Sequence, residues 1–453
     1  MYRHDGRRSG STTTAVPAEL SRQWEVQLAC QASQAVIVGD RLWVAEKDAQ
    51  RIRCLDATSG EDVWEFTGGG RIDSAPTVYG GMVLFGCRDG SVYCLRATDG
   101  ALVWRQRAAP DRQRLVSFEQ LESVWPVQGS VLVQDGVVYF AAGRSSFLDG
   151  GILVYGLDAK TGRVLCHHLL EGPWPNIKED TGRPFAMEGA LPDLFVSDGH
   201  DLYMQRIKFD AKLNRLQTQR ESDLGELDMG ADHLVATGGF LDDTGFDRLY
   251  WMYGRRWPGF YFAQHAPKSG QLVVFDDSTT YAVKYFYRRV QWSPAFFPAE
   301  HGYLLFADDN DNQPFLEDRA ATAKAIKWLP EETYTDAYRR GGRGVEKGSG
   351  YQRERPAKWQ KMIPLRIRAM VLAGDRLFAA GMPDVVDPAD PLAAFEGRRG
   401  ALLQVFSTTD GSLAKSYPLA SLPAFDGLSA AAGRLYLATR DGKLICLGEA
   451  AGK

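Results

Sequence analysis

Ionisable side chains in the middle of the sequence could do chemistry on an anionic substrate. The candidates for catalysis are Arg206, His233, Tyr253 and Arg255. Arginine binds a carboxylate through two parallel hydrogen bonds, and histidine or tyrosine can act as general base or acid. On a uronate-type polysaccharide, arginine would neutralise the C5 carboxylate while His233 or Tyr253 removed the C5 proton in a β-elimination. These residue types predict a site for a glycan or another anionic ligand, with lyase or hydrolase activity.

Other polar residues would complete the binding site. Those expected near the catalytic group are Glu188, Arg248, Arg256, His265 and Arg366. For each of them the alternative is a structural ion pair or hydrogen bond between neighbouring loops, which needs no function. No metal site is expected, because the Asp/Asn run at 308–312 is followed by Gln313 and Arg319 where an EF-hand loop needs glycine and glutamate.

Repeated sequence units must position these residues. CLDATSGEDVW at 54–64 returns as CLRATDGALVW at 94–104, and LDAKTGRVL at 157–165 has the same pattern. Short alternating apolar runs broken by Gly or Asp turns indicate antiparallel strands joined by hairpins. A four-stranded unit repeated about every 40 residues is a propeller blade. We therefore expect an all-β, closed propeller that forms a single domain over 1–453.

The copies predict eight blades, with seven as the alternative because the fifth and sixth are hard to divide. We place the fifth over 232–287 and begin the sixth at 293. The last copy, at 428–449, lacks a fourth strand, whereas RQWEVQL at 22–28 looks like a fourth strand with none before it. We expect this N-terminal strand to complete the last blade and close the ring, which removes a free sheet edge.

The repeat also predicts which side chains face the central channel. The residues six positions before the turn that follows each innermost strand are Ser33, Ser74, Gly129, Asp193, Arg368 and Asp426. Small residues fall on one side of the ring and charged residues on the other. Asp193, Arg368 and Asp426 therefore join the expected ligand-binding residues.

One segment, 308–362, departs from the repeat and is expected to be a basic insertion within blade six. Between Arg319 and Lys361 it contains eleven Lys or Arg and five acidic residues. It includes a stretch compatible with a helix over 319–340, and we expect it to lie over one face of the ring. The alternative is a solvated loop, which is the usual state of charge-rich segments.

Composition limits the partners. A net charge of -4 gives no general attraction to nucleic acid or to anionic lipid. No apolar run is long enough for a membrane helix, and the N-terminus lacks the apolar core of a signal peptide. The protein is then either cytoplasmic or begins after a removed signal. The six cysteines include no CxxC and no adjacent pair, which argues against zinc, haem attachment and a vicinal disulfide.

The turn motif resembles that of the pyrroloquinoline-quinone-like (quinoprotein alcohol dehydrogenase-like) β-propeller repeat family. Leu55–Trp64 and Leu157–Leu165 are most similar to its A-x-D-x-x-T-G-x-x-x-W-like signature. That family includes quinone-dependent alcohol and sugar dehydrogenases and an outer-membrane assembly lipoprotein that binds no cofactor. Longer stretches, such as GGFLDDTGFDRLYWMYGRRWPG, look like uncharacterised planctomycete-type propeller proteins. The resemblance implies an extracytoplasmic protein, periplasmic or secreted, although this chain carries no signal peptide.

The resemblance implies pyrroloquinoline quinone and calcium as cofactors, but the residues disfavour both. The chain has no adjacent cysteine pair, and its candidates for stacking, metal binding and catalysis, such as Trp125, Glu188 and Asp426, are scattered. We expect a glycan or other anionic or polyhydroxylated ligand at the central face. The alternatives are a protein-interaction scaffold that uses its blade edges and a quinone-dependent dehydrogenase. A central face filled with paired charges, together with exposed apolar residues, would favour the scaffold.

Overall fold

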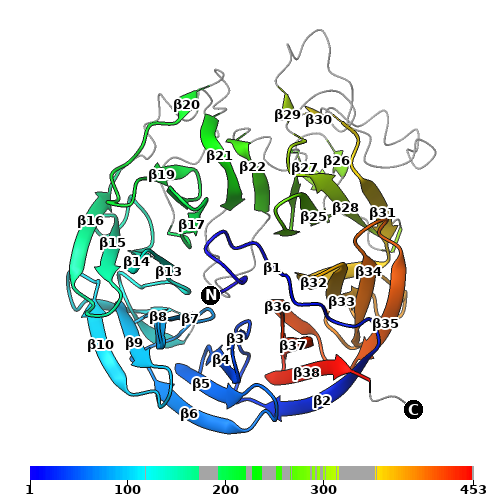
Figure 1. Cartoon of the computed structure of the whole chain (residues 1–453), viewed down its shortest axis with the longest axis horizontal. Helices are drawn as coiled ribbons and strands as arrows, with labels where there is room; N and C mark the ends of the chain where they lie inside the picture. Colours follow the sequence, from blue (N-terminus) through cyan, green and yellow to red (C-terminus); the bar gives the residue numbers. More distant parts are fainter. Residues whose placement is uncertain are drawn as a thin grey trace.

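Short apolar runs separated by Gly and Asp turns form strands here because alternate side chains of each run are buried between blades. In the computed structural model the described strands form eight sheets of three to five strands around a central channel, together with three two-stranded sheets (Figure 1). This confirms the all-β propeller and its eight blades. The structure describes residues 1–117, 119–172, 192–220, 227–236, 251–257, 266, 268–285, 288–290, 293–295, 299–300, 302–312, 314–315, 352–353 and 355–450.

Blades one to three follow the repeat, each with four antiparallel strands. Blade one contains β3 (Val36–Val38), β4 (Arg41–Glu46), β5 (Arg51–Asp56) and β6 (Asp62–Thr67). Blade two contains β7 (Thr77–Tyr79), β8 (Met82–Cys87), β9 (Ser91–Arg96) and β10 (Leu102–Arg107). Blade three contains β13 (Leu132–Gln134), β14 (Val137–Ala142), β15 (Ile152–Asp158) and β16 (Val164–Leu170).

Blades four to seven are less regular. The described part of blade four contains β17 (Val196–Ser197), β18 (Leu202–Met204) and β19 (Ile207–Phe209). Blade five contains β20 (Gln219–Arg220), β21 (Leu227–Ala236), β22 (Trp251–Trp257) and β23 (Ser269–Gly270). Blade six contains β24 (Leu272–Phe275), β25 (Thr279–Lys284), β28 (Tyr303–Asp309) and β31 (Trp359–Ile363). Blade seven contains β32 (Leu365–Ala373), β33 (Arg376–Pro383), β34 (Ala401–Ser407) and β35 (Leu413–Leu419).

The predicted division between blades five and six was wrong. Strands β24 and β25 had been placed in blade five, but they belong to the sheet β24-β25-β28-β31. Strand β25 pairs with β28 from Thr279 opposite Asp309 to Lys284 opposite Leu304. Because residues 285–302 separate these two strands in the sequence, proximity along the chain assigned β25 to the wrong sheet.

The N-terminal strand closes the ring, as predicted. Blade eight contains β36 (Pro423–Ala431), β37 (Arg434–Thr439), β38 (Lys443–Glu449) and β2 (Leu20–Gln27). Strands β2 and β38 are antiparallel, with Trp24 opposite Cys446. One sheet thus joins strands from near the two ends of the sequence, and Figure 1 shows β2 and β38 side by side at the bottom of the ring.

The expected insertion in blade six lies between strands β28 and β31. Its predicted limits, 308 and 362, were too wide, because β28 extends to Asp309 and β31 begins at Trp359. Between them the short strands β29 (Pro314–Phe315) and β30 (Gln352–Arg353) pair with each other. The stretch compatible with a helix, 319–340, lies outside the described residues.

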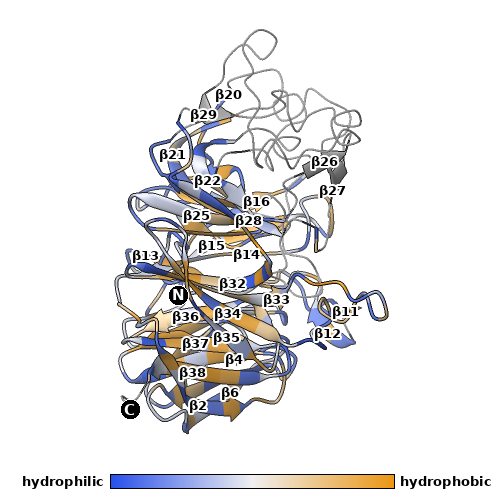
Figure 2. Cartoon of the chain, turned by 90° about the vertical axis from the view of Figure 1, so that its right-hand side faces the viewer, coloured by the Kyte–Doolittle hydropathy of each residue, from blue (hydrophilic) through white to orange (hydrophobic). Residues whose placement is uncertain are grey.

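The two faces of the ring carry different connections. Residues 13–19 cross one face, the one in front in Figure 1, to reach β2; we call it the segment face. Strands β26 (Arg288–Val290) and β27 (Ser293–Ala295) form a two-stranded hairpin. Another small hairpin, β11 (Arg114–Ser117) with β12 (Gln120–Ser123), projects from the other side of the ring in Figure 2. We call this the hairpin face. No helix that could cross a bilayer is present among the described residues.

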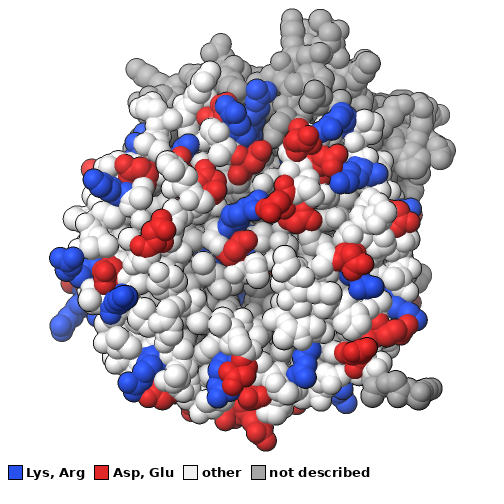
Figure 3. All heavy atoms as spheres, viewed as in Figure 1, with Lys and Arg blue, Asp and Glu red and all other residues white. Residues whose placement is uncertain are grey.

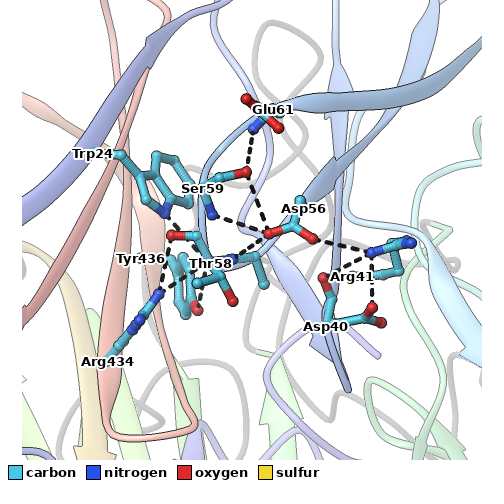
Figure 4. Close-up of polar contacts among 10 residues, drawn as sticks. Trp24, Asp40, Arg41, Asp56, Thr58, Ser59, Glu61, Arg434 and Tyr436 are labelled. Carbon is cyan, nitrogen blue, oxygen red and sulfur yellow. Dashed lines mark hydrogen bonds and ion pairs between the residues drawn. The ribbon is translucent and has the colours of Figure 1, made fainter.

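The repeated turn fastens each regular blade to the next one. At the turn of blade one, Asp56 Oδ1 accepts hydrogen bonds from the backbone N–H groups of Thr58 (2.9 Å) and Ser59 (3.0 Å), as Figure 4 shows. Gly60 has a φ of +78°, and a Cβ there would lie 2.9 Å from the Trp24 ring. The Trp24 indole N–H donates to the carbonyl oxygen of residue 57 at 3.2 Å. Blade eight is therefore joined to blade one by a tryptophan packed on a glycine turn.

The same contact, which we call the Trp–turn contact, recurs around the ring. The indole N–H groups donate to backbone carbonyl oxygens from Trp64 to Ala97 (2.9 Å), from Trp104 to Ala159 (3.1 Å) and from Trp359 to Thr408 (2.8 Å). Cysteines 54, 94 and 446 are buried strand residues, as the repeat predicts. The repeated motif is thus structural.

Candidate functional site

The first residues of the chain occupy the central channel. Residues 1–12, which we call the channel segment, lie in the middle of the ring in Figure 1. Tyr2, Arg3 and Arg8 are almost completely buried, with exposed fractions of 1%, 1% and 0%. Two arginines can be buried this deeply only if polar partners surround them.

Arg3 joins three blades to the channel segment. Its Nη1 forms an ion pair with Asp426 Oδ2 of blade eight at 2.7 Å. Its backbone N–H donates to Gln34 Oε1 of blade one at 2.7 Å, and its Nη2 donates to the carbonyl oxygen of Val273 in blade six. Tyr2 Oη also donates to Asp426 Oδ2, at 2.6 Å. Burial acts to lower the pKa of Arg3, but the Asp426 carboxylate outweighs it and the pKa is raised.

Arg8 extends the contacts to the other side of the channel. Its guanidinium donates to the carbonyl oxygens of Phe195 in blade four (3.2 Å) and Ser130 near blade three (3.4 Å). Strand β1 (Ser11–Thr12) then pairs in parallel with β32 of blade seven. The channel segment therefore contacts blades one, three, four, six, seven and eight, and it occupies the position where we expected a ligand.

A small cavity remains beside the channel segment. It has a volume of about 190 Å³, and Arg3, Gln34, Val371 and Ser429 are among the residues that line it. Figure 3 shows acidic and basic side chains interspersed over the segment face, with no large area of one sign. Among the residues that Figure 3 colours, arginines do not gather in one area of this face.

His233 and Tyr253 do not point to a common site. His233 stacks on Tyr203 of blade four, with ring centroids 3.6 Å apart, whereas Tyr253 packs on Phe275 of blade six, at 4.1 Å. Burial lowers the pKa of His233 to about 4 and raises that of Tyr253. The two side chains lie on opposite faces of blade five and cannot act on one substrate atom together.

The remaining candidates on blades four and five make local contacts. Arg255 forms two hydrogen bonds with Asp228, both at 2.6 Å, and these hold the pKa of Asp228 below its usual range. Asp193 is buried and accepts from the backbone N–H of Leu194 at 2.6 Å. Arg206 and Arg256 also have partners within the protein. Three further candidates lie outside the described residues: Glu188, Arg248 and His265.

The candidate residues on blades seven and eight also contact other groups of the protein. Arg366 lies over the rings of Tyr285 (5.1 Å) and Phe395 (4.6 Å). Arg368 Nε donates to the carbonyl oxygen of Pro423 at 3.2 Å. Asp426 faces the channel, where its Oδ2 takes the hydrogen bonds of Tyr2 and Arg3. Two of the described candidates contact the channel segment: Asp426 binds Tyr2 and Arg3, and Tyr253 Oη accepts a hydrogen bond from Arg7 at 3.5 Å.

A buried network on the hairpin face was not foreseen. Arg88 contacts Asp73 Oδ2 at 2.5 Å and Glu122 Oε2 at 3.1 Å, and Arg144 contacts the same Glu122 oxygen at 2.6 Å. Arg71 contacts Asp73 at 3.4 Å. These residues come from connections that differ between blades, so alignment of the repeats could not bring them together. The Arg-Asp-Gly turn at 88–90 recurs at 440–442, so the turn itself could not single out this network.

The Trp–turn contacts and the strand that closes the ring define the class: the protein is an eight-bladed β-propeller with a repeated tryptophan and turn motif. Residues 13–223 match the family model described as outer membrane protein assembly factor BamB, which is slightly less than half of the chain. This finding agrees with the resemblance of the turn motif. No curated protein sequence matches the chain.

Solved structures with the same fold include two quinohemoprotein alcohol dehydrogenases. ADHIIG from Pseudomonas putida HK5 is 12% identical with a TM-score of 0.52, and the match covers 99% of this chain and 80% of that one. The enzyme from Comamonas testosteroni is 12% identical with a TM-score of 0.51, over 100% and 81% of the two chains. BamB from Moraxella catarrhalis is 12% identical with a TM-score of 0.49, over 96% and 99%. At such identities the likeness shows the fold alone, and the likeness to planctomycete-type proteins gains no support.

Proposed function

We propose that this propeller is a non-enzymatic protein that binds another protein through its hairpin face. The observation that carries the proposal is the filled channel: Arg3 and Tyr2 of the chain itself engage Asp426, where we had expected a ligand. The match to a model described as an assembly factor supports a role in protein interaction. It also supports an extracytoplasmic location, which remains part of the proposal.

Exposed apolar side chains on the hairpin face give the proposed interaction a surface. Val116 and Leu121 of the β11–β12 hairpin have exposed fractions of 73% and 58%. Phe147 and Leu148, in the loop between β14 and β15, are 52% and 54% exposed. The indole N–H of Trp125, at the base of the hairpin, donates to the carbonyl oxygen of Asp149 at 2.8 Å and holds the two regions together. Neighbouring exposed apolar groups of this kind mark protein-binding surfaces.

The glycan-lyase hypothesis receives less support from the geometry. A general base must reach the proton that it removes, and one near neutral pKa is most effective. His233 is buried under Tyr203, with its pKa lowered to about 4. Tyr253 is buried on the opposite side of the blade. Neither side chain is placed to take a proton from a polysaccharide in the channel.

The described residues do not fit a quinone at the channel either. The described candidates for that role are Trp125 and Asp426, and each has another partner. Trp125 packs with Ala109 and Val124 at the base of the hairpin, whereas Asp426 binds Arg3 in the channel. The two side chains belong to different parts of the ring, and we derive no reaction through a quinone.

Site-specific photocrosslinking tests the proposal. A benzophenone amino acid at Val116 or at Phe147, in cells that make the protein naturally, should give a discrete crosslinked product of higher mass. The same group at Thr58, an exposed turn residue of the rim, should give none. In parallel, the purified protein should show no turnover of uronate polysaccharides and no quinone-dependent dye reduction. Turnover in either assay, with no crosslink at the hairpin face, would refute the proposal.

A further inference from the structure

An arginine-lined pocket lies next to the β11–β12 hairpin, away from the channel. It has a volume of about 630 Å³. Its lining residues are Asp89, Ser91, Arg105, Arg107, Asp111, Arg112, Gln113, Arg114 and Ser123. Strand β10 of blade two provides two of the arginines, and the hairpin with the turn before it provides the other two. The volume lies in the range of about 300 to 1,000 Å³ that is typical of ligand sites.

Most of the positive charge in this pocket is not neutralised by the chain. Arg105 is paired with Asp89 at 2.7 Å, and that buried carboxylate also accepts a hydrogen bond from Tyr93 Oη at 2.6 Å. In the part of the chain that the structure describes, Arg107, Arg112 and Arg114 form no ion pair.

The one other acid in the lining is Asp111. Its carboxylate accepts hydrogen bonds from the next two residues of the chain, one from the backbone N–H of Arg112 and one from Gln113 Nε2 at 3.4 Å. Three exposed arginines thus face a single exposed carboxylate. This excess favours an anionic ligand, because guanidinium groups bind carboxylates bidentately.

The pocket continues into the exposed apolar residues of the hairpin. Arg114 pairs with Ser123, and Val116 pairs with Leu121, in the same two-stranded ladder. Because alternate residues of a strand point to the same side, all four side chains share one face of the hairpin. The other face is used internally: Leu115 packs with Ala109, Val124 and Trp125. Basic and apolar groups therefore form one continuous surface.

The geometry points to an extended acidic segment of a partner protein as the ligand of this surface, an assignment that rests on the proposed protein-binding function. Its carboxylates would bind Arg107, Arg112 and Arg114, and its apolar side chains would cover Val116 and Leu121. Positions 114 and 116 are about 7 Å apart along the strand, which is also the spacing of alternate side chains in an extended peptide. A small anion would use the arginines but not the apolar pair.

Fluorescence anisotropy of labelled peptides on the full chain tests this assignment. The probe contains four glutamates followed by two leucines separated by glycine. We expect it to bind, and we expect at least tenfold weaker binding when glutamines replace the glutamates. Replacing the leucines with serines should weaken binding several-fold. Added salt should also weaken it, because the contacts are ionic and exposed.

Two matched variants locate the site. Arg107→Gln/Arg112→Gln/Arg114→Gln should weaken binding of the acidic probe at least tenfold while leaving the urea midpoint of unfolding unchanged. The control, Arg22→Gln/Arg96→Gln/Arg163→Gln, removes the same charge from exposed rim positions and should bind as the natural chain does. Equal losses in the two variants would show general charge attraction and overturn the assignment.

Two further outcomes separate this assignment from the function on which it rests. If the serine peptide binds as tightly as the leucine peptide, and inorganic phosphate displaces both, the pocket binds small anions and the peptide assignment is wrong. If no peptide binds while Val116 still crosslinks to a partner, the acidic chemistry is wrong and the protein-binding function stands. If the acidic peptide binds but the protein also turns over a uronate polysaccharide or reduces the dye, the peptide assignment stands and the non-enzymatic function is wrong.

Discussion

The rim and the channel of this propeller are held together in different ways. On the rim, one contact is repeated: Trp24, Trp64, Trp104 and Trp359 each donate to a turn carbonyl of the next blade. In the channel, a single segment contacts six blades, and its buried ion pair between Arg3 and Asp426 occurs once. If one Trp–turn contact is removed, the other copies still join their blades. No other contact of the same kind replaces the Arg3–Asp426 ion pair.

The largest effect is therefore expected in the channel. Arg3→Met should destabilise the protein by about 3–5 kcal/mol, because it leaves the buried Asp426 carboxylate without its cation. Urea unfolding measures the loss. Arg22→Met is the matched control on the rim, since Arg22 forms an exposed ion pair with Glu25 at 2.7 Å and should contribute less than about 1 kcal/mol. If the two variants lost the same stability, the channel would have no special role.

Acidification should lower the free energy of unfolding through the buried side chain of His233. The buried His233 has its pKa lowered to about 4, whereas the unfolded chain takes up the proton near its usual value of about 6.5. Stability from this group is fully present above that value and is lost as pH falls from about 6.5 to about 4, by up to about 3 kcal/mol. His233→Phe keeps a ring on Tyr203 and should flatten this part of the pH profile of unfolding. An unchanged profile would contradict the burial of a neutral histidine.

A single rim contact should matter less than the ion pair in the channel. Trp64 is partly exposed, so Trp64→Ala should cost about 2 kcal/mol, below the range of about 3–5 kcal/mol for a buried aromatic residue. Trp64→Phe removes the hydrogen bond to Ala97 and should cost about 1 kcal/mol. Urea unfolding distinguishes the two. A Trp64→Ala loss larger than that of Arg3→Met would reverse the proposed order of rim and channel.

The smallest effect on stability is expected on the hairpin face. Val116→Ser/Leu121→Ser changes exposed side chains and should alter the free energy of unfolding by less than about 0.5 kcal/mol. Thermal unfolding checks this. A loss above about 1 kcal/mol would mean that these side chains pack within the fold and do not form a free surface.

The sequence was enough to predict the rim because its motif is repeated. The Asp56 turn, Gly60 and the packed tryptophan recur in several copies, and their spacing sets the length of a blade. The strand that closes the ring was found for the same reason, since Trp24 marks a fourth strand without a blade of its own. Blades five and six could not be divided correctly, because strand pairing there skips over residues 285–302.

The channel could be predicted only in part. Counting from the turns correctly placed Asp426 toward the centre, but its partners Tyr2 and Arg3 lie outside every repeat. Nor could a list of reactive residue types show that His233 and Tyr253 point away from each other across blade five. These facts depend on contacts made once, between residues far apart in the sequence.

The closure of the ring also sets the order in which the protein can be completed during synthesis. Strand β2 precedes blades one to seven in the sequence, whereas its partner β38 follows all of them. Tyr2 and Asp426 are separated by 424 positions. Forming contacts between such distant residues requires closing a long loop, which slows folding. Strand β2 must therefore wait for its partner until blades one to seven and β38 have been made, and during that interval its edge is open to a chaperone.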